Sequence, residues 1–376
     1  MRFTLRIDKL TFEGFRNIQP GVLTPKPGVN ILYGDNAQGK TNLLEACWLF
    51  TGAKSFRGAR DSELVRFGEQ QAVLTLQFQA GDREQEAEMK IAGRRHLTLN
   101  GIPQKSATAM AGRFCAVVFC PAHLSLLSGG PEERRRFMDT AYCQLRPGYL
   151  KVLSEFQRIL TQRNTLLKTI RSGEMPTGAA SDRDTNALLD VWDTRFAEAC
   201  TKVTLARAAY LRHILPIATE LYDGLSGQKE RLGISLISPV NGEIRDPSAL
   251  CDAYLAAIRE ARAADIGAGF STVGAHREDL QIEINGTPAK TFASQGQQRS
   301  AVLALKLSEA SLLREVTGEQ PVALLDDVMS ELDLTRQDFI LNHIHDWQVL
   351  ITCCDPVAIE RQTGGQVFHI QNGEIL

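Results

Sequence analysis

The sequence predicts an α/β fold with two lobes, one of mixed β structure around a nucleotide-binding helix and one that is mainly helical. A phosphate-binding pattern runs from Gly34 to Thr41, between an apolar run and an amphipathic run. Short apolar runs separated by turns fill residues 1–120, whereas residues 131–222 carry apolar side chains at helical spacing. At 376 residues the chain exceeds the size at which a single core keeps growing, so we expect two lobes.

The first lobe begins as hairpin-like β structure. We expect strands at residues 5–12, 29–33, 73–78, 86–91, 95–99 and 116–119, each an apolar run bounded by turn residues. Asn100 and Gly101 follow one of these runs and form a strong two-residue turn signal. We expect the helix that follows the phosphate loop to pack against these strands.

The phosphate-binding pattern is a complete G-x-x-x-x-G-K-T. Its glycines let backbone N–H groups surround a polyphosphate, Lys40 supplies charge near the β- and γ-phosphates, and the Thr41 hydroxyl can ligate Mg²⁺. The helix N-terminus adds a partial charge of roughly +0.5. A chance glycine-rich turn is the alternative. We therefore predict a nucleoside triphosphate site formed by Gly34, Asp35, Asn36, Ala37, Gln38, Gly39, Lys40, Thr41 and Asn42.

The second lobe begins at Pro131, where proline and acidic residues mark the first turn of a helix. Two long antiparallel helices are expected at 148–171 and 186–222, joined by a turn-rich tip at 172–181. We favour ordinary helix packing over a partner-binding role for their apolar faces. Strands are expected again at 234–237 and 280–284, followed by a helix at 297–315.

Two carboxylates, Asp326 and Asp327, directly follow the buried-type apolar run 322–325. In phosphate-loop NTPases one such aspartate orients the Mg²⁺ shell. The adjacent acid can orient the attacking water or accept its proton. A surface turn is the alternative interpretation, but the phosphate loop elsewhere in the chain favours the Walker B element.

A second anion-binding helix start lies at 294–299, where a Ser/Gly-rich turn opens a helix. The chain thus carries two such helix starts and one complete Lys/Mg²⁺ set. One explanation is that the second start closes over the nucleotide of another copy, so that a two-fold dimer holds two ATP molecules between unlike surfaces.

Composition restricts the function only weakly. The chain has 42 basic and 44 acidic residues, and this formal charge of −2 does not by itself indicate a nucleic-acid binder. No apolar stretch approaches the ~20 residues that cross a bilayer, so we expect no membrane association. The eight scattered cysteines are expected to be reduced thiols in a cytoplasmic protein.

The motifs at 294–299, 324–327 and 330–333 resemble the signature, Walker B and D-loop of the RecF family, bacterial DNA replication and repair ATPases related to SMC and Rad-type ABC proteins. Further matching motifs lie at 12–17, 54–57, 61–64, 129–137 and 274–279. The resemblance implies an ABC-type ATPase head. Lobe I would comprise residues 1–130 and 300–376, and the inserted, mainly helical lobe II would comprise residues 131–299 with the arm and the signature motif.

The resemblance also implies a function. Similar proteins bind duplex DNA as an ATP-dependent homodimer and hydrolyse ATP slowly. They act at gaps and stalled forks, helping RecO and RecR load RecA. For this chain we therefore expect ATP and Mg²⁺ as ligands, sequence-nonspecific binding of duplex, gapped or junction DNA, and RecR- or RecO-type partners.

Site roles follow from the same resemblance. Lys40 and Thr41 would bind phosphate and Mg²⁺, with Asp326 holding the metal shell. Asp327 stands where most relatives carry Glu and would be the catalytic acid, its shorter reach suiting a slow ATPase. Further contacts to nucleotide, partly to that of the partner copy, would come from Arg57, Ser294, Gln295 and Gly296. Arg16 and Asn17 would lie near the base and ribose, although a surface ion pair or a capping role is the alternative for these two and for Arg57.

Two departures from the family pattern leave roles open. Thr352 is our candidate for the position of the switch histidine, and the Q-loop glutamine expected near 119–123 is absent. His276 suits either proton transfer or a structural hydrogen bond. The peptide at 127–131 also looks like an ABC signature, but its distance from Asp326 favours a helix-capping loop. Candidate DNA-binding cations are Arg134, Arg135, Arg136, Lys151, Arg158, Arg163 and Lys168. A solvated helix face is the favoured alternative for each of them alone, whereas grouped on one surface of a dimer they could neutralise phosphates without reading bases.

The alternative functions are the energy subunit of a membrane transporter and a phosphotransferase that acts on a small molecule. The signature-like motif at 294–299 argues against both.

Overall fold

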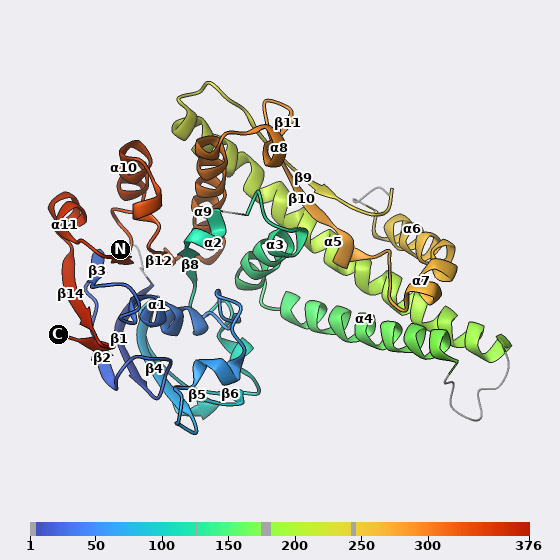
Figure 1. Ribbon diagram of the computed structural model, residues 1–376, viewed down its shortest axis with the longest axis horizontal. Coiled ribbons are helices and arrows are strands. Elements are labelled where there is room, and N and C mark those ends of the chain that lie inside the picture. Colours follow the sequence, from blue (N-terminus) through green and yellow to red (C-terminus); the bar gives the residue numbers. More distant parts are fainter. Residues whose placement is uncertain (1–4, 125, 174–181, 242–245) are drawn as a thin grey trace. The chain divides into compact units, whose positions relative to one another are not determined.

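The computed structural model describes residues 5–124, 126–173, 182–241 and 246–376. They divide into two compact units (Figure 1). Unit 1 combines Met1–Ser128, Ile217–Leu232 and Ala289–Leu376, and unit 2 combines Gly129–Pro216 and Gly233–Pro288. Among the described residues, none of the helices combines the length and apolar character that crossing a membrane requires.

The central sheet of unit 1 is mainly parallel. Its order is β15 (Glu374–Ile375), β14 (Gln366–Gln371), β3 (Val29–Tyr33), β13 (Val349–Cys353), β12 (Val322–Asp326) and β8 (Ala116–Phe119). Strands β3, β8, β12 and β13 are nearly continuous apolar runs. Only the pairing of β15 with β14 is antiparallel among these described strands. Since the other strands are parallel, β3, β12 and β13 end at one edge of the sheet, where functional residues of open α/β sheets gather.

The helices of unit 1 are α1 (Lys40–Leu49), α2 (Pro121–Leu124), α8 (Ala289–Phe292), α9 (Gln295–Thr317), α10 (Leu334–His343) and α11 (Val357–Thr363), with short 3₁₀ turns at Asp61–Leu64, Ala107–Met110 and Met329–Glu331. α1 contacts β12 and β13, and α9 packs against β8. The helix predicted at 297–315 is confirmed as α9. It is slightly longer than predicted and begins at Gln295, because Ser294 caps its N-terminus.

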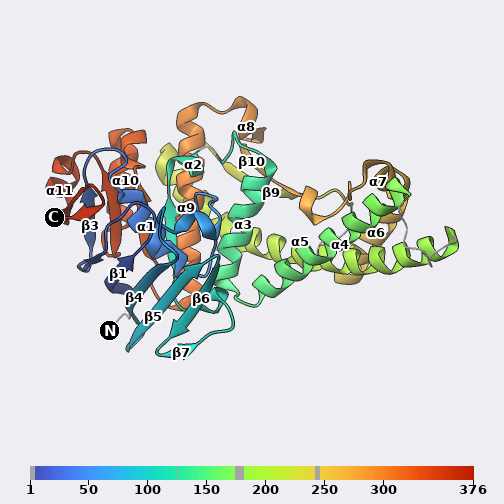
Figure 2. The same ribbon diagram turned by 60° about the horizontal axis from the view of Figure 1, so that its bottom comes forward.

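A second, antiparallel sheet of unit 1 is visible in Figure 2. Its order is β2 (Gly21–Leu23), β1 (Arg6–Glu13), β4 (Ala72–Ala80), β5 (Arg83–Ala92), β6 (Arg94–Leu99) and β7 (Ile102–Pro103). Buried positions alternate with partly buried or exposed ones along β4, as a sheet with one face on the core requires. The predicted turn between β6 and β7 is confirmed, since Asn100 and Gly101 both have positive φ, 50° and 76°.

Unit 2 contains the long helices α3 (Pro131–Leu145), α4 (Tyr149–Ser172) and α5 (Asp182–Ser226), the last of which continues into unit 1 beyond Pro216. It also contains α6 (Pro247–Glu260), α7 (Arg262–Ala268), a 3₁₀ turn at Ala275–Arg277 and the sheet β11 (Thr287–Pro288), β10 (Asp279–Ile284) and β9 (Leu232–Ile237). The two predicted long helices are confirmed. Most of the predicted tip between them lies outside the described residues.

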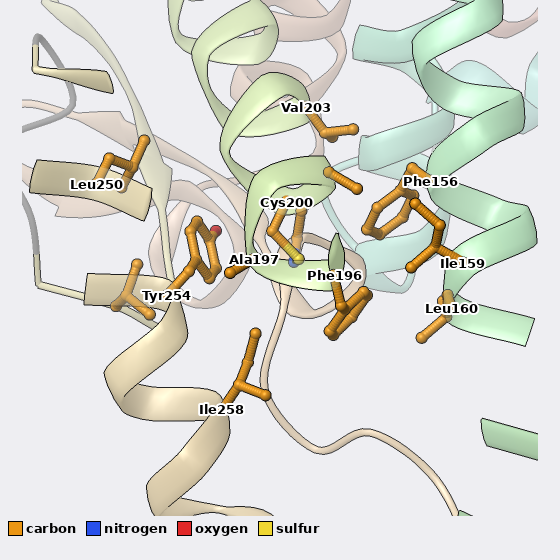
Figure 3. Close-up of a cluster of buried hydrophobic side chains, with 13 residues drawn as sticks. Phe156, Ile159, Leu160, Phe196, Ala197, Cys200, Val203, Leu250, Tyr254 and Ile258 are labelled. Carbon is orange, nitrogen blue, oxygen red and sulfur yellow. The ribbon is translucent and has the colours of Figure 1, made fainter. Parts of the chain in front are cut away.

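A hydrophobic cluster forms the core of unit 2 (Figure 3). Phe156 of α4 stacks on Phe196 of α5, with ring centroids 5.9 Å apart. Tyr254 and Ile258 of α6 are also buried in this cluster. The apolar faces of these helices therefore serve ordinary packing, as the sequence predicted. The eight cysteines of the chain are free thiols.

The division into units differs from the predicted lobes at one functional position. The sequence placed residues 131–299 together, whereas Ala289–Arg299 belong to unit 1. The physical reason is the continuity of α9, whose start cannot be separated from the part that packs against β8. The signature-like motif thus lies in the same compact unit as the phosphate loop. The assignment of the two units to functional lobes stays a prediction.

Candidate nucleotide site

The phosphate loop connects the end of β3 to the start of α1. Gly34 and Gly39 have φ of 152° and 110°, and a Cβ at Gly34 would lie 2.2 Å from the carbonyl oxygen of Ile370. Glycine is therefore required there by both conformation and space. Gly39 is the N-cap of α1 and provides no side-chain cap, so the amides of Lys40 and Thr41 have no intrahelical acceptor, whereas that of Asn42 bonds to the Gly39 carbonyl oxygen at 3.0 Å. This geometry suits an anion.

The side chain of Lys40 is held inside the loop. Its Nζ donates to the carbonyl oxygens of Gly34 at 2.5 Å and Asp35 at 2.8 Å, and the residue is 8% exposed. The turn between β14 and β15 holds the loop from the other side. There the backbone N–H of Gly373 donates to the carbonyl oxygen of Gln38 at 3.0 Å, and that of Asn372 donates to Gln38 Oε1 at 2.5 Å. Sequence reasoning had given this turn no role.

The predicted Walker B acid meets the phosphate loop directly. The Thr41 hydroxyl donates to Asp326 Oδ1 at 2.7 Å, joining the start of α1 to the end of β12. Thr352 approaches the same oxygen because it is the register partner of Asp326 in the neighbouring strand β13. Burial raises the pKa of Asp326, whereas the hydrogen bonds from Thr41 and Thr352 oppose that rise. The structure therefore brings together Lys40, Thr41, Asp326 and Thr352.

Thr352 lies behind the two acids and is only 1% exposed. Its hydroxyl donates to Asp326 Oδ1 at 3.0 Å and accepts the backbone N–H of Asp327 at 2.9 Å. Both hydrogen-bonding functions of the hydroxyl are thereby used inside the protein. This geometry favours a positioning role for Thr352, which orients the two acids. The catalytic role that goes with the switch-histidine position predicted from the sequence stays a prediction.

Asp327 differs from Asp326 in exposure and backbone conformation. It is exposed and adopts a left-handed φ of 50°. The Ser330 hydroxyl donates to its carbonyl oxygen at 2.8 Å and lies 3.2 Å from Oδ1. The buried carboxylate of Asp326 is therefore suited to hold a metal ion, and the exposed carboxylate of Asp327 is suited to contact the attacking water.

The oxygens of Thr41 and Asp326 fit a magnesium ion. A hydroxyl oxygen and a carboxylate oxygen 2.7 Å apart form a hard-oxygen pair. A cation beside Asp326 would favour the ionised form that burial alone disfavours. Among the described residues, no group of three His, Cys, Asp or Glu side chains gathers as a metal site. Mg²⁺ commonly completes such sites with phosphate oxygens and water.

A buried carboxylate that sequence reasoning missed, Glu45, organises the remaining polar residues near the loop. It is 0% exposed, and Arg16 donates to its two oxygens at 3.0 and 3.1 Å. The Ser55 hydroxyl also bonds to it, and Arg57 lies 4.0 Å away. Arg57 donates to Asn42 Oδ1 at 2.8 Å. The predicted residues Arg16, Arg57 and Asn42 thus form one cluster around an acid that looked like an ordinary helical glutamate.

The signature-like motif is the capped start of α9. Ser294 Oγ accepts the N–H of Gln297, and Gln297 Oε1 accepts the N–H of Ser294, so the capping box is complete. Ser294 and Gln295 are exposed. In the described part of the chain, no hydrogen bond or ion pair joins Ser294, Gln295 or Gly296 to the phosphate loop.

The D-loop region is joined to this motif instead. Arg336 donates to the carbonyl oxygen of Gly296 at 2.9 Å and to Ser300 Oγ at 2.9 Å. Arg299 forms an ion pair with Glu331 at 3.1 Å. The motif expected at a partner's nucleotide is therefore fixed to the D-loop region of its own chain.

Two of the predicted DNA-binding cations are contradicted by the structure of unit 2. Arg163 is 0% exposed and donates to Asp193 at 2.9 Å and Asp265 at 2.7 Å. Arg134 is 4% exposed and forms a bidentate pair with Asp279 at 2.6 and 2.8 Å. Guanidinium groups engaged in this way cannot neutralise DNA phosphates. Arg136, Lys151, Arg158 and Lys168 are exposed, Arg135 is half-buried, and their role stays a prediction.

The two histidines near open roles are both held neutral by burial. The His276 ring bonds to the carbonyl oxygen of Ser271 at 2.9 Å, and burial lowers its pKa to about 4. The structural interpretation of His276 is therefore favoured. In the Q-loop region, burial lowers the pKa of His123 to about 3. The Q-loop role remains unassigned.

Comparisons with known proteins identify relatives along almost the whole chain. The family model "RecF/RecN/SMC N terminal domain" matches residues 6–374. The DNA replication and repair protein RecF of Synechocystis sp. is 39% identical over 351 residues, covering 92% of this chain and 91% of that protein. RecF of Acetivibrio thermocellus is 33% identical over 368 residues, which is 97% of each chain.

Solved structures give the same picture. The recombination mediator protein RecF-ATP in the RecFOR pathway matches with a TM-score of 0.90 and 33% identity, covering 100% of this chain and 98% of that one. The Smc head domain from Pyrococcus furiosus matches with a TM-score of 0.53 and 15% identity over 99% of this chain and 96% of that one. The latter similarity concerns the fold alone.

Proposed function

The chain belongs to the RecF family of DNA replication and repair proteins, and on this premise we propose that it is an ATP-dependent DNA-binding protein of recombinational repair and replication restart. The observation that carries the proposal is the hydrogen bond between Thr41 and Asp326, which joins the two halves of a phosphate-loop ATPase site. The transporter rival is not favoured, because the relatives are repair proteins along their full length.

Each residue at the loop has a role in this proposal. Lys40 and the N–H groups of α1 bind the phosphates of ATP, and Thr41 with Asp326 holds Mg²⁺, which supplies charge neutralisation at the phosphates. Asp327 orients or deprotonates the attacking water. Thr352 keeps both acids in place. The family relative bound to ATP supports the choice of nucleotide.

A second copy of the chain completes the site. The exposed start of α9 at Ser294 would meet the triphosphate held by the partner copy, with Gln295 and Gly296 adding contacts. Its attachment to the D-loop region through Arg336 and Arg299 would move both motifs together. We propose that ATP binding drives this pairing on DNA and that slow, DNA-dependent hydrolysis ends it.

The remaining parts of the proposal concern partners. The dimer would bind duplex, gapped or junction DNA through phosphate contacts without reading base sequence. RecR- and RecO-type mediators would then act with it to load RecA. This cycle places the protein in the bacterial cytoplasm.

The test is the size of the protein with and without ATP and DNA, measured by sedimentation velocity. Wild type should form dimers with ATP and Mg²⁺, whereas Lys40→Ala should neither bind ATP nor pair. Lys105→Ala, which removes an exposed lysine from outside the phosphate loop and outside the family motifs, is the charge-matched control and should pair normally. A Lys40→Ala protein that still pairs on adding ATP would refute the role given to the loop.

A further inference from the structure

Glu45 is an acid buried one turn inside the nucleotide-binding helix. Its side chain is 0% exposed, and it faces the cations Arg16 and Arg57 together with the Ser55 hydroxyl. A buried carboxylate is costly unless it is paired and hydrogen-bonded. Here the pairing comes from two different segments, one before β2 and one after α1. Glu45 therefore fixes two arginines beside the start of α1.

The two arginines differ in their exposure and in how many of their N–H donors bond within the protein. Arg16 is 18% exposed in its side chain and makes a bidentate pair with Glu45, adding a bond to the carbonyl oxygen of Glu63 at 3.0 Å. Arg57 is 46% exposed and stands 4.0 Å from Glu45, and one of its nitrogens bonds to Asn42. Arg57 consequently keeps further N–H donors accessible from solvent, as a guanidinium has five in all.

A chain of side-chain hydrogen bonds links Arg57 to the phosphate loop. Arg57 donates to Asn42 Oδ1 at 2.8 Å, and Asn42 Nδ2 donates to Asn17 Oδ1 at 2.5 Å. Asn17 Nδ2 then donates to the carbonyl oxygen of Ala37 at 2.9 Å. Ala37 has a φ of 63°, a left-handed conformation that is uncommon for a residue other than glycine. The relay therefore ends on the strained residue of the loop.

The location of Arg57 indicates which part of a nucleotide it serves. Arg57 donates to Asn42, the residue that directly follows Thr41 in α1, and Thr41 bonds to Asp326. Arg57 is therefore joined to the helical turn that holds this acid. In a phosphate-loop site this acid stands at the β/γ end of the nucleotide, where ATP carries charge that ADP lacks.

We propose that Glu45 is a positioning residue for the triphosphate, holding Arg57 and, through Asn42 and Asn17, the Ala37 turn of the phosphate loop in the arrangement that favours ATP over ADP. This inference rests on the proposed function, because it assumes that ATP binds at the loop. It adds a role for an acid that itself touches no phosphate. Glu45 acts through Arg57.

The experiment compares ATP and ADP affinities by titration calorimetry for wild type, Glu45→Gln, Arg57→Ala and the double variant. Glu45→Gln should weaken ATP by about tenfold to a hundredfold, the range for loss of a charge-assisted hydrogen bond, and ADP by less than about threefold. If Glu45 acts through Arg57, the double variant should lose no more ATP affinity than Arg57→Ala alone. Additive losses, or equal losses for ATP and ADP, would overturn the proposal.

Two further variants keep the test decisive. Glu309→Gln removes another buried carboxylate of unit 1, paired with Lys306 within α9, and should lower the melting temperature while leaving the ATP:ADP preference unchanged. If Glu45→Gln does not fold, Asn17→Ala breaks the relay at its last bond and should reduce ATP affinity by about twofold to tenfold. An unchanged Asn17→Ala protein would refute the relay. Lys40→Ala distinguishes failure of this inference from failure of the proposed function. If the Lys40→Ala protein still binds ATP, the proposed function fails as well.

Discussion

Replacement of Thr352 by valine isolates the contribution of one buried hydroxyl to the candidate site. Valine has nearly the same shape, so the change removes the bond to Asp326 at 3.0 Å and the bond from the Asp327 N–H at 2.9 Å without opening a large cavity. A hydrogen bond to a charged group contributes about 1.5–3 kcal/mol, and a neutral one contributes about 0.5–1.5 kcal/mol. We therefore expect the free energy of unfolding to fall by about 2–4 kcal/mol at neutral pH.

The functional consequence follows from the same two bonds. Without Thr352, only Thr41 still bonds to Asp326 Oδ1, and the backbone of Asp327 loses its acceptor. The loop and Lys40 are untouched. ATP turnover should therefore fall by a larger factor than ATP affinity does, because orientation of the acids matters most in the transition state.

The assay is urea unfolding followed by tryptophan fluorescence and circular dichroism, combined with single-turnover ATP hydrolysis. Thr352→Ser is the matched control, since it keeps the hydroxyl and should retain most of the stability and turnover. If the serine variant loses as much as the valine variant, packing of the methyl group, not the hydroxyl, would explain the effect. If the valine variant has the unfolding free energy and turnover of wild type, the two hydrogen bonds contribute to neither.

Three other predictions concern neighbouring acids and the start of α9. Asp327→Asn should leave ATP binding intact but trap the ATP-bound dimer, and unchanged turnover in a steady-state assay would remove Asp327 from the mechanism. Ser294→Arg should leave ATP binding by the monomer intact and block pairing in sedimentation, whereas normal pairing would contradict contact in trans. Asp326→Asn should stabilise the metal-free protein at pH 7, because burial raises the pKa of Asp326 and ionisation then opposes folding. Since a raised pKa means that the stability contribution is lost as pH rises through the folded value, this advantage should shrink in urea titrations below the ordinary Asp pKa of 3.8, and a constant difference would refute it.

The parts of the site that the sequence predicted are those encoded by short, contiguous patterns. Gly34 to Thr41 needs a strand before it and a helix after it, and both are visible as local periodicity. Asp326 needs only the apolar run before it. Its meeting with Thr41 also follows from topology, because β3, β13 and β12 are parallel neighbours that end at the same edge. No long-range side-chain packing has to be known for these inferences.

Charged residues were the main source of error. A basic residue on a long helix usually faces water, and on that basis Arg163 was predicted to contact DNA. Its acceptors Asp193 and Asp265 lie 30 and 102 residues away along the chain. Helical periodicity carries no information about such partners. The same reason explains Arg134, whose partner Asp279 is 145 residues away.

The expected end of lobe II at residue 299 has a different origin. It came from the family resemblance, in which lobe II presents the signature motif, whereas the compact unit that contains the phosphate loop also contains all of α9 with its cap. The capped start of α9 is bonded to the D-loop region through Arg336 and Arg299.

This attachment sharpens the argument for a second copy. Within unit 1, one helix start is built into the phosphate loop and adjoins Asp326, while the other is capped by Ser294 and fixed to the D-loop region. Among the described residues, hydrogen bonds and ion pairs join each motif to different neighbours. A two-fold pair uses both starts at once, since each chain then offers its loop to one nucleotide and its α9 start to the other.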